Sequence, residues 1–256
     1  MESKINYKVF GEGEPVIIMH GLLGMLDNWQ TFAKKLGQSH MVYTLDLRNH
    51  GKSFHHGEMD YPIMAEDLRQ FMEDHHMFRA NILGHSMGGK VAMEFALQNP
   101  DMVNRLMVAD ISPAKYPGGH EHILDAMRSA NLESAEDRDE ILKHLMNAIE
   151  DEGIVLFLMK NLSRNKGGGF RWKANLEAIS DNYHNILDEV NSFDSFDAPT
   201  LFIKGGQSKY LSDPYIDPVK DLFSRSQIRE IPDAGHWVHA DAPAETMRLV
   251  KEFLDR

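Results

Sequence analysis

The sequence predicts an α/β protein built on a parallel sheet, and two observations carry this prediction. Short apolar runs, the candidate strands, alternate with longer segments of helical periodicity along most of the chain. Most of these runs are apolar along their whole length, as expected of parallel strands whose two faces are both covered by helices. A chain of 256 residues is also long enough to bury a self-sufficient core.

Six strands and four helices are expected in this regular part of the chain. The strands are residues 16–19, 41–45, 81–83, 106–109, 200–203 and 228–231. The helices are residues 28–36, 62–75, 87–98 and 244–254. Pro100 stops the third helix, and Pro243 stands where a first helical turn accepts proline. The order of elements is therefore βαβα, which is typical of a parallel sheet flanked by helices.

Between the fourth and fifth predicted strands, the alternation of strands and helices stops and only helices are expected. Four apolar segments follow one another from about Pro113 to Phe193, and the glycines 167–169 form a turn between the third and the fourth. A helical block that interrupts a regular α/β chain predicts an inserted cap. The expected organisation is an α/β core of residues 1–112 and 194–256 with a helical cap, or lid, of residues 113–193.

Composition excludes several kinds of chemistry. The chain has no cysteine, so disulfides, thiolate zinc sites, iron–sulfur clusters and cysteine nucleophiles are impossible. Its 39 acidic and 27 basic residues give a formal net charge of −12, which argues against nucleic-acid and anionic-membrane partners. The histidine pairs at 55–56 and 75–76 lack metal-ligand spacing, so no metal is expected. No organic cofactor is expected either, because the serine-based reaction described below needs none.

The amino-terminal segment carries no pattern of a targeting signal. Charged residues interrupt any apolar stretch among the first fifteen residues, and the apolar run 16–26 is too short to span a bilayer. We therefore expect a cytoplasmic protein. The oligomeric state has no signature in the sequence.

The candidate nucleophile is Ser86, in the pattern Gly84-x-Ser86-x-Gly88. The pattern directly follows the strand 81–83 and directly precedes the helix 87–98, which is the context of a nucleophile elbow. A sharp strand-to-helix turn strains the backbone of the serine, and the flanking glycines remove side chains that would collide there. The same residues begin a phosphate-binding loop pattern, but Val91 stands where that pattern needs a hydroxyl.

The candidate base is His236, one of 14 histidines. It lies after the last strand and before the final helix, at the sheet edge where ligand sites of α/β proteins form. A histidine that follows the serine in the chain also matches the triad order of one large hydrolase class. Leu23, His85 and Trp237 are the expected substrate-binding residues beside this pair.

At this point the sequence resembles the α/β-hydrolase fold superfamily over essentially its whole length. Four motifs carry the resemblance, in the family order: His20-Gly21-Leu22-Leu23-Gly24, the segment from Asp46 to Ser53, the serine elbow, and Gly235-His236. Its finer motifs are similar to those of a subfamily of small bacterial acyl esterases and thioesterases and of a mitochondrial abhydrolase-domain group. The resemblance implies an α/β-hydrolase fold with a cap, and an oxyanion hole formed by the backbone N–H groups of Leu22 and Met87.

The triad acid departs from the commonest family pattern. That pattern has a carboxylate directly after the penultimate strand, but here the first one is Asp213, well beyond residues 200–203. Asp110 ends the strand that follows the nucleophile helix and is the favoured acid, as in the narrower subfamily. Asp213 and Asp217 remain as alternatives, and Asp110 could instead serve only to cap its turn.

The expected function is hydrolysis of short-to-medium acyl esters or thioesters, including coenzyme A thioesters, through an acyl-enzyme on Ser86. The partner would be a small-molecule acyl ester or thioester. Two alternatives use the same fold for catalysis: a C–C bond hydrolase or lyase, and a cofactor-free haloperoxidase-like enzyme. A third alternative is a binding protein without catalysis. Acyl-chain length and the choice between ester and thioester depend on the shape of the cap.

Overall fold

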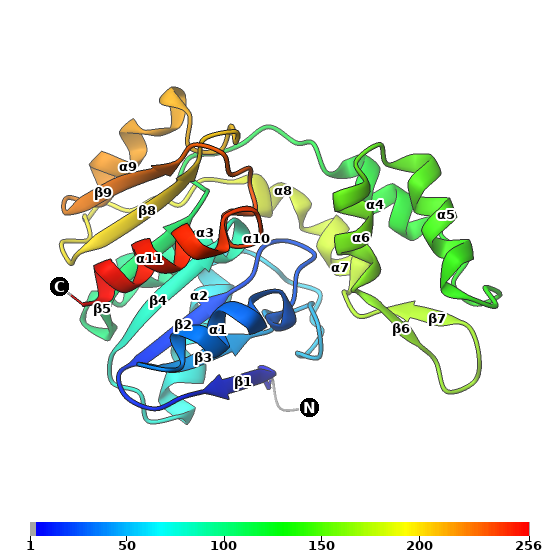
Figure 1. Ribbon diagram of the computed structural model, residues 1–256, viewed down its shortest axis with the longest axis horizontal. Helices are drawn as coiled ribbons and strands as arrows, with labels where there is room; N and C mark the ends of the chain where they lie inside the picture. The colour runs from blue at the N-terminus through cyan, green and yellow to red at the C-terminus, as the bar shows by residue number, and fades with distance from the viewer. Residues whose placement is uncertain (1–3, 256) are drawn as a thin grey trace.

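The computed structural model describes residues 4–255 and has the predicted architecture, a mostly parallel sheet flanked by helices (Figure 1). The strand order is β1-β3-β2-β4-β5-β8-β9, with β1 antiparallel to β3 and the other neighbours parallel. The strands are β1 Tyr7–Phe10, β2 Pro15–Met19, β3 Met41–Leu45, β4 Ala80–His85, β5 Val103–Ala109, β8 Thr200–Gly205 and β9 Ser226–Ile231.

The helices of the α/β part are α1 Gln30–Leu36, α2 Tyr61–Asp74, α3 Met87–Gln98, α9 Asp217–Leu222, α10 Val238–Asp241 and α11 Pro243–Leu254. The four predicted helices are present to within two residues, as α1, α2, α3 and α11, whereas α9 and α10 were not predicted. Three single turns of 3₁₀ helix are η1 Leu26–Trp29, η2 Pro100–Met102 and η3 Asp213–Tyr215. Helix α1 is shorter than predicted because the chain enters it through the 3₁₀ turn η1.

Alternating side chains of each strand pack into two separate apolar layers. On β2, Val16 and Ile18 face the layer that contains residues of α1 and α11, whereas Ile17 and Met19 face the layer that contains residues of α2 and α3. Figure 1 shows α1 and α11 in front of the sheet. Burial of both strand faces explains why the sequence shows continuous apolar runs instead of alternation.

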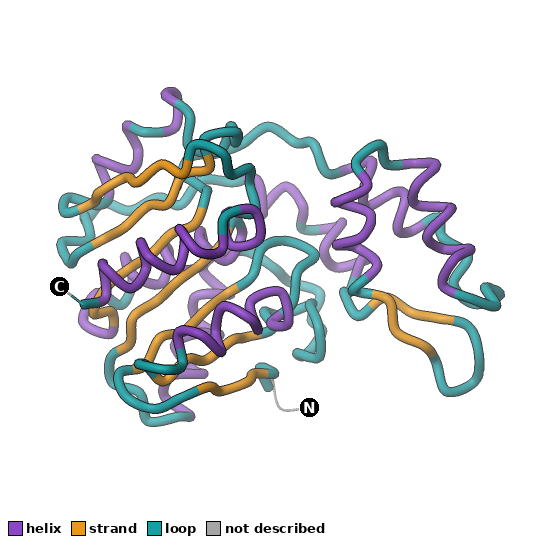
Figure 2. The backbone as a smooth tube through the Cα atoms, in the orientation of Figure 1, coloured by secondary structure: helices purple, strands orange, loops and turns teal. Residues whose placement is uncertain are grey.

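The segment between β5 and β8 is helical, apart from one hairpin. Its elements are α4 Glu121–Arg128, α5 Arg138–Ala148, α6 Glu152–Met159, β6 Leu162–Arg164, β7 Phe170–Trp172, α7 Leu176–Asp181 and α8 Tyr183–Leu187. We call residues 113–193 the cap, as in the sequence-based prediction. Figure 2 shows most of its helices set apart from the sheet and joined to it by loops.

Three strands were not predicted from the sequence, and their composition explains why. The edge strand β1 pairs on one side only and exposes Lys8 and Val9, so it has no continuous apolar run. Strands β6 and β7 have three residues each and form an antiparallel hairpin around the glycines 167–169. The glycines therefore form a turn, as predicted, but the turn joins two strands instead of two helices.

The chain enters and leaves the cap through one narrow neck. Here the N–H of Tyr116 donates to the carbonyl of Leu187 at 2.9 Å, and the N–H of Val190 donates to the carbonyl of Pro113 at 2.7 Å. The two connecting segments are thus bonded to each other. We call these two segments, residues 113–116 and 187–190, the neck.

Lys90 holds the neck against the nucleophile helix α3. Its buried ammonium donates to the carbonyl of Ala114 at 2.7 Å and to the carbonyl of Asp188, one from each side of the neck. It also lies 4.9 Å from the centre of the Tyr116 ring. Burial lowers the pKa of Lys90 to about 7. One side chain of the core therefore contacts both ends of the cap.

Asparagines make many of the remaining polar contacts between cap and core. Each of four cap asparagines bonds to a loop of the core: Asn161 to the carbonyl of Leu23, Asn175 to the backbone and side chain of Asn49, Asn182 to Gly57 and Met59, and Asn185 to the carbonyl of Met59. We call this set the asparagine seam. Its amides satisfy loop carbonyls that no strand or helix would otherwise pair.

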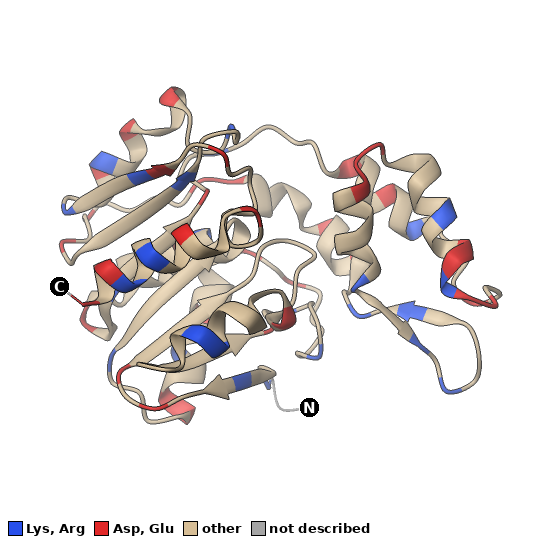
Figure 3. Cartoon of the chain, in the orientation of Figure 1, with Lys and Arg blue, Asp and Glu red and all other residues tan. Residues whose placement is uncertain are grey.

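Charged side chains are spread over both parts of the molecule (Figure 3). Acidic residues occur on the core helices and on the cap. Lysines and arginines lie on core helices and strands and also on the β6–β7 hairpin. Within residues 4–255, no helix is both long enough and apolar enough to cross a bilayer.

Candidate active site

A cavity of about 690 Å³ lies where the carboxyl ends of the strands meet the cap. Loops after β2, β4, β8 and β9 form its core side, and α4 and α6 form its cap side. Its lining includes these residues: Leu22, Leu23, His85, Ser86, His120, Ile123, Ile154, Leu156, Phe157, Leu158, Tyr210, His236 and Trp237. Parallel α/β sheets bind ligands at this edge, so the cavity is the candidate active site.

Ser86 occupies a strained turn between β4 and α3. Its φ of 51° and ψ of −120° lie in a region that residues with a side chain rarely adopt. The turn is closed on both sides, because a Cβ on Gly84 would lie 2.1 Å from the carbonyl oxygen of Gly88, and one on Gly88 would lie 2.5 Å from that of His20. The glycine–serine–glycine spacing thus has a steric cause, and Ser86 lies at the wall of the cavity.

His236 and Asp110 form a hydrogen-bonded pair. The Nδ1 atom of His236 lies 2.8 Å from Oδ2 of Asp110, whose side chain is fully buried. The second carboxylate oxygen accepts the N–H of Gly205 at 2.8 Å, so both oxygens have donors. Asp110 adopts a φ of 52°, and its own N–H donates to the carbonyl of Ile203 at 2.8 Å. Backbone contacts from β8 therefore hold this carboxylate in place.

The alternative acids lie elsewhere. Asp213 and Asp217 begin η3 and α9, and both side chains are exposed. In the described part of the chain, neither forms a hydrogen bond or ion pair with His236.

The serine and the histidine share the cavity without a direct bond. Ser86 and His236 both line it, and across residues 4–255 their side chains form no hydrogen bond with each other. Catalytic hydrogen bonds of this kind often shorten only when substrate is bound. The ring of Tyr210 lies 4.2 Å from the ring of His236 and covers one side of it.

Four neighbouring histidines are held neutral. Burial lowers the pKa of His20 to about 4 and that of His50 to about 3. Burial of its ring, which stacks 4.0 Å from Trp29, likewise lowers the pKa of His239 to about 3. Burial and the nearby His236 place the pKa of His85 well below its usual range, and its Nε2 donates to the carbonyl of His236 at 2.8 Å. Of these five histidines, His236 is the one paired with a carboxylate.

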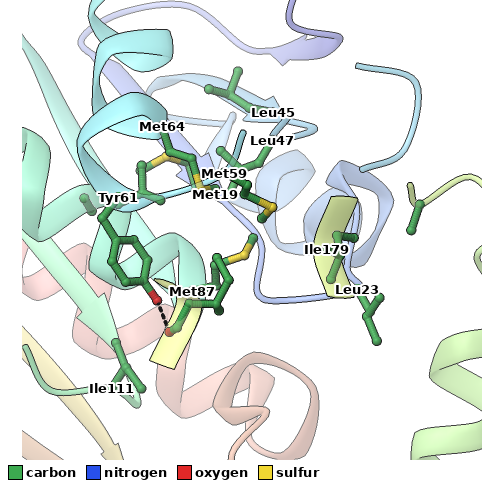
Figure 4. Close-up of a cluster of buried hydrophobic side chains, with 14 of the residues drawn as sticks. Met19, Leu23, Leu45, Leu47, Met59, Tyr61, Met64, Met87, Ile111 and Ile179 are labelled. Carbon is green, nitrogen blue, oxygen red and sulfur yellow. Dashed lines mark hydrogen bonds between the residues drawn. The ribbon is translucent and has the colours of Figure 1, made fainter. Parts of the chain in front are cut away.

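The two predicted oxyanion N–H groups are unpaired where the structure describes them. Leu22 lies in the turn after β2, and its N–H has no hydrogen-bond partner among residues 4–255. Met87 is the first residue of α3, where a backbone N–H lacks an intrahelical partner. Figure 4 shows the Met87 side chain among the buried methionines Met19 and Met59, so its side chain belongs to the core.

The predicted substrate-binding residues all line the cavity, with different surroundings. Leu23 is buried, and the ring of His85 is tied to the backbone of His236. The ring of Trp237 lies 5.5 Å from that of Phe157 on α6, where core and cap meet.

Sequence reasoning missed the cap side of the cavity. Helix α6 contributes Ile154, Leu156, Phe157 and Leu158, and α4 contributes Ile123. The signal that could have found α6 is its apolar composition on all sides, since a helix exposed to water on one face would carry polar residues there. Leu156 is 51% exposed and marks the part of the lining that reaches solvent.

Among residues 4–255, no group of three or more histidine, aspartate or glutamate side chains is arranged to hold a metal ion.

Comparison with known proteins confirms the class that the fold and the motifs define. The sequence profile of the alpha/beta hydrolase fold matches residues 14–243, and the chain belongs to that family. It is 36% identical to the sn-1-specific diacylglycerol lipase ABHD11 of Mus musculus over 247 residues, which cover 93% of this chain and 80% of that protein. It is 32% identical to esterase YbfF of Escherichia coli K12 over 242 residues, which cover 94% and 93%.

One solved structure has nearly the same fold as this chain. A marine microorganism esterase superposes with a TM-score of 0.96 at 40% identity, covering 98% of this chain and 100% of that one. The resemblance to esterases and to an abhydrolase-domain group, predicted from the motifs, is therefore confirmed.

Proposed function

We propose that the protein is a serine hydrolase that cleaves carboxylic esters with a short-to-medium acyl group. The observation that carries the proposal is the Asp110–His236 pair, 2.8 Å apart and buried on the aspartate side, in one cavity with the strained Ser86. A nucleophile, a base and an acid that orients the base are the parts that acyl transfer requires. The esterases and the lipase that this chain resembles support the same reaction class.

In this proposal the reaction proceeds through an acyl-enzyme. Nε2 of His236 takes the proton of the Ser86 hydroxyl as its oxygen attacks the acyl carbonyl carbon, and the Leu22 and Met87 N–H groups stabilise the resulting oxyanion. The carbon–oxygen bond to the alcohol breaks as His236 protonates the leaving oxygen. Water, deprotonated by His236, then attacks the acyl carbon, the bond from that carbon to the Ser86 oxygen breaks, and His236 returns the proton to this oxygen as the carboxylic acid leaves. Asp110 keeps Nδ1 protonated and stabilises the imidazolium throughout.

The lining favours an uncharged, apolar substrate. The cap side consists mainly of leucine, isoleucine and phenylalanine. The Asp, Glu, Lys and Arg residues of the lining are Asp151 and Lys160 of the cap and Asp241 of the core. Two carboxylates against one ammonium do not complement the phosphates of a coenzyme A thioester. Residues 1–112 and 194–256 would thus supply the chemistry, and the cap, residues 113–193, would shape the acyl pocket.

The first test is covalent labelling with a fluorophosphonate, together with hydrolysis of p-nitrophenyl esters. Wild type should be labelled on Ser86, and Ser86→Ala should lose labelling and lower kcat on the order of 10⁴-fold or more. Ser195→Ala, a change at an exposed serine in the loop before β8, is the matched control and should behave as wild type. A folded Ser86→Ala protein with near-normal ester turnover would refute the proposal.

The substrate class is tested with p-nitrophenyl esters and acyl-coenzyme A thioesters of graded length. We expect higher kcat/KM for the esters at every length. A preference for the coenzyme A thioesters would show that the charge argument is wrong, while leaving the acyl-enzyme chemistry intact.

A further inference from the structure

We propose that Asn161 of the cap is a positioning residue for the oxyanion hole: it links the acyl-binding helix α6 to the loop that carries the Leu22 N–H. This inference rests on the proposed serine-hydrolase function. It deepens that function by assigning a role in transition-state stabilisation to a cap residue that contributes no atom to the triad.

The backbone of Leu23 is held from two opposite parts of the molecule. Its N–H donates to Nε2 of His50 in the core at 3.1 Å, and its carbonyl accepts the side-chain N–H of Asn161 in the cap at 2.6 Å. Leu23 has a φ of 57°, a conformation that a leucine adopts only where its surroundings impose it. Leu22, the proposed oxyanion donor, is the preceding residue.

The contact with His50, on the core side, is fixed by a second hydrogen bond of the same ring. Nδ1 of His50 donates to the carbonyl of Arg48 at 2.8 Å, which leaves Nε2 unprotonated and able to accept the N–H of Leu23. The ring is fully buried.

Asn161, which makes the contact on the cap side, is also fixed by its surroundings. Asn161 is fully buried, its N–H donates to the carbonyl of Leu158 at 2.8 Å, and its carbonyl accepts the N–H of Lys173 at 2.9 Å. Its side-chain oxygen has no hydrogen-bond partner among the described residues. A buried amide oxygen without a partner lowers the stability of the fold. The favourable contact of this side chain is the bond from its N–H to the Leu23 carbonyl.

Asn161 connects this contact to the substrate cavity. It stands two residues after the end of α6, whose Ile154, Phe157 and Leu158 line the acyl side of the cavity. An acyl group that packs against α6 therefore presses on an element bonded to the oxyanion loop. Displacement of a catalytic donor by about 1 Å can cost on the order of 100-fold in rate, so a loop held from one side only would stabilise the oxyanion less well.

The other members of the asparagine seam lack this connection. Asn175, Asn182 and Asn185 bond to core residues between 49 and 59, not to residues 20–24. Asn182 thus offers a matched control, because its side-chain N–H also donates from the cap to a core carbonyl, that of Gly57, at 2.7 Å.

The test compares Asn161→Leu with Asn182→Leu. Leucine has the same branched outline of four side-chain heavy atoms as asparagine, and at position 161 it removes the unpaired amide oxygen, so this variant should fold. For Asn161→Leu we expect kcat on a p-nitrophenyl ester to fall at least tenfold with KM within threefold of wild type. Asn182→Leu should keep both values within threefold.

A second measurement separates positioning from general loosening of the cap. A trifluoromethyl ketone forms a hemiketal oxyanion with the serine, whereas the matching secondary alcohol binds without forming one. Asn161→Leu should weaken inhibition by the ketone in parallel with kcat and leave inhibition by the alcohol unchanged. If Asn161→Leu does not fold, Asn161→Ser, whose hydroxyl is too short to reach the Leu23 carbonyl, should give the same result.

Three outcomes would overturn the inference. One is a kcat of Asn161→Leu within threefold of wild type. Another is a loss of kcat that the ketone affinity does not follow, and a third is an equal loss in Asn182→Leu. If wild type itself neither hydrolyses the ester nor binds the ketone, the proposed function fails first, which the labelling of Ser86 identifies independently.

Discussion

The core and the cap differ in the backbone conformations that they contain. Among residues 4–255, the non-glycine residues with positive φ are Leu23, Asn49, His76, Ser86 and Asp110, and all of them lie in the core. Three of these line the cavity or hold His236. In the cap, acidic and amide side chains cap ordinary helices, as Asp137, Asp151 and Asn175 do and as Asp60 does for α2 of the core.

The difference shows where each part of the molecule can tolerate change. Strained residues fix the direction of a few atoms, which catalysis requires, and they need tight surroundings to persist. An apolar helix such as α6 offers shape and surface, which many sequences could provide. Substitutions in the core should therefore change the rate of the chemistry, and substitutions in the cap, with the exception of Asn161, should change the choice of substrate.

Apart from the loss of Ser86, the largest effect should come from the acid. Asp110→Asn cannot accept the Nδ1–H of His236 as a carboxylate does, so the ring adopts the wrong tautomer and kcat should fall on the order of 10³-fold or more. Asp213→Asn, at an exposed position, should leave kcat within about twofold. Steady-state kinetics with one ester on both variants is sufficient, and the reverse ranking would assign the acid to position 213.

The stability of the core should depend on pH through its buried histidines. The pKa of His20 is lowered to about 4 and that of His50 to about 3, against about 6.5 in the unfolded chain. Between these values the unfolded state binds more protons, so the stability is complete above pH 6.5 and is lost as the pH falls toward 4. For His20 alone, the full loss amounts to about 3 kcal/mol.

Urea unfolding at several pH values between about 7 and 5 measures this slope. His50→Gln should flatten it, since glutamine can accept the Leu23 N–H without titrating. His144→Gln, a change in the cap, should leave it unaltered. Equal slopes in all three proteins would show that the acid sensitivity does not reside in His50.

The smallest effect should come from Phe157, on the cap side of the cavity. Phe157→Ala removes the ring that packs 5.5 Å from Trp237 and widens the cavity on its acyl side. We expect kcat/KM to fall about threefold to tenfold for medium-length acyl esters, through KM, with little change for acetyl esters. A uniform loss of kcat across all chain lengths would instead indicate that α6 acts on the chemistry.

Local patterns were sufficient to predict six of the seven strands of the main sheet and two of the candidate catalytic residues. The strand-to-helix context of Ser86 and the position of His236 after the last strand are features of a few neighbouring residues. The choice between Asp110 and Asp213 could not be made from the residues alone, because each follows a strand near the same sheet edge. Only the loop conformation brings Asp110 to 2.8 Å from His236 and leaves Asp213 exposed.

The orientation of the cap was beyond local patterns altogether. Helical periodicity predicted α4, α5 and α6 but not which of their faces meets the core. The contact of Asn161 with Leu23 joins residues 138 positions apart, and nothing near either residue indicates the other. The β6–β7 hairpin was missed because three-residue strands are too short for an alternation to be recognised.

The neck has a consequence for how this fold can diversify. The N–H of Val190 donates to the carbonyl of Pro113, and Lys90 donates to one carbonyl on each segment of the neck. The cap is therefore comparable to a long loop whose two ends are bonded to each other. The entropy of closing a loop grows only with the logarithm of its length, by about 0.6 kcal/mol for each doubling. Insertions, deletions or replacements above the neck that keep the contact of Asn161 with Leu23 should therefore cost the core little. The acyl pocket can then change in evolution while the bonds around Asp110 stay as they are.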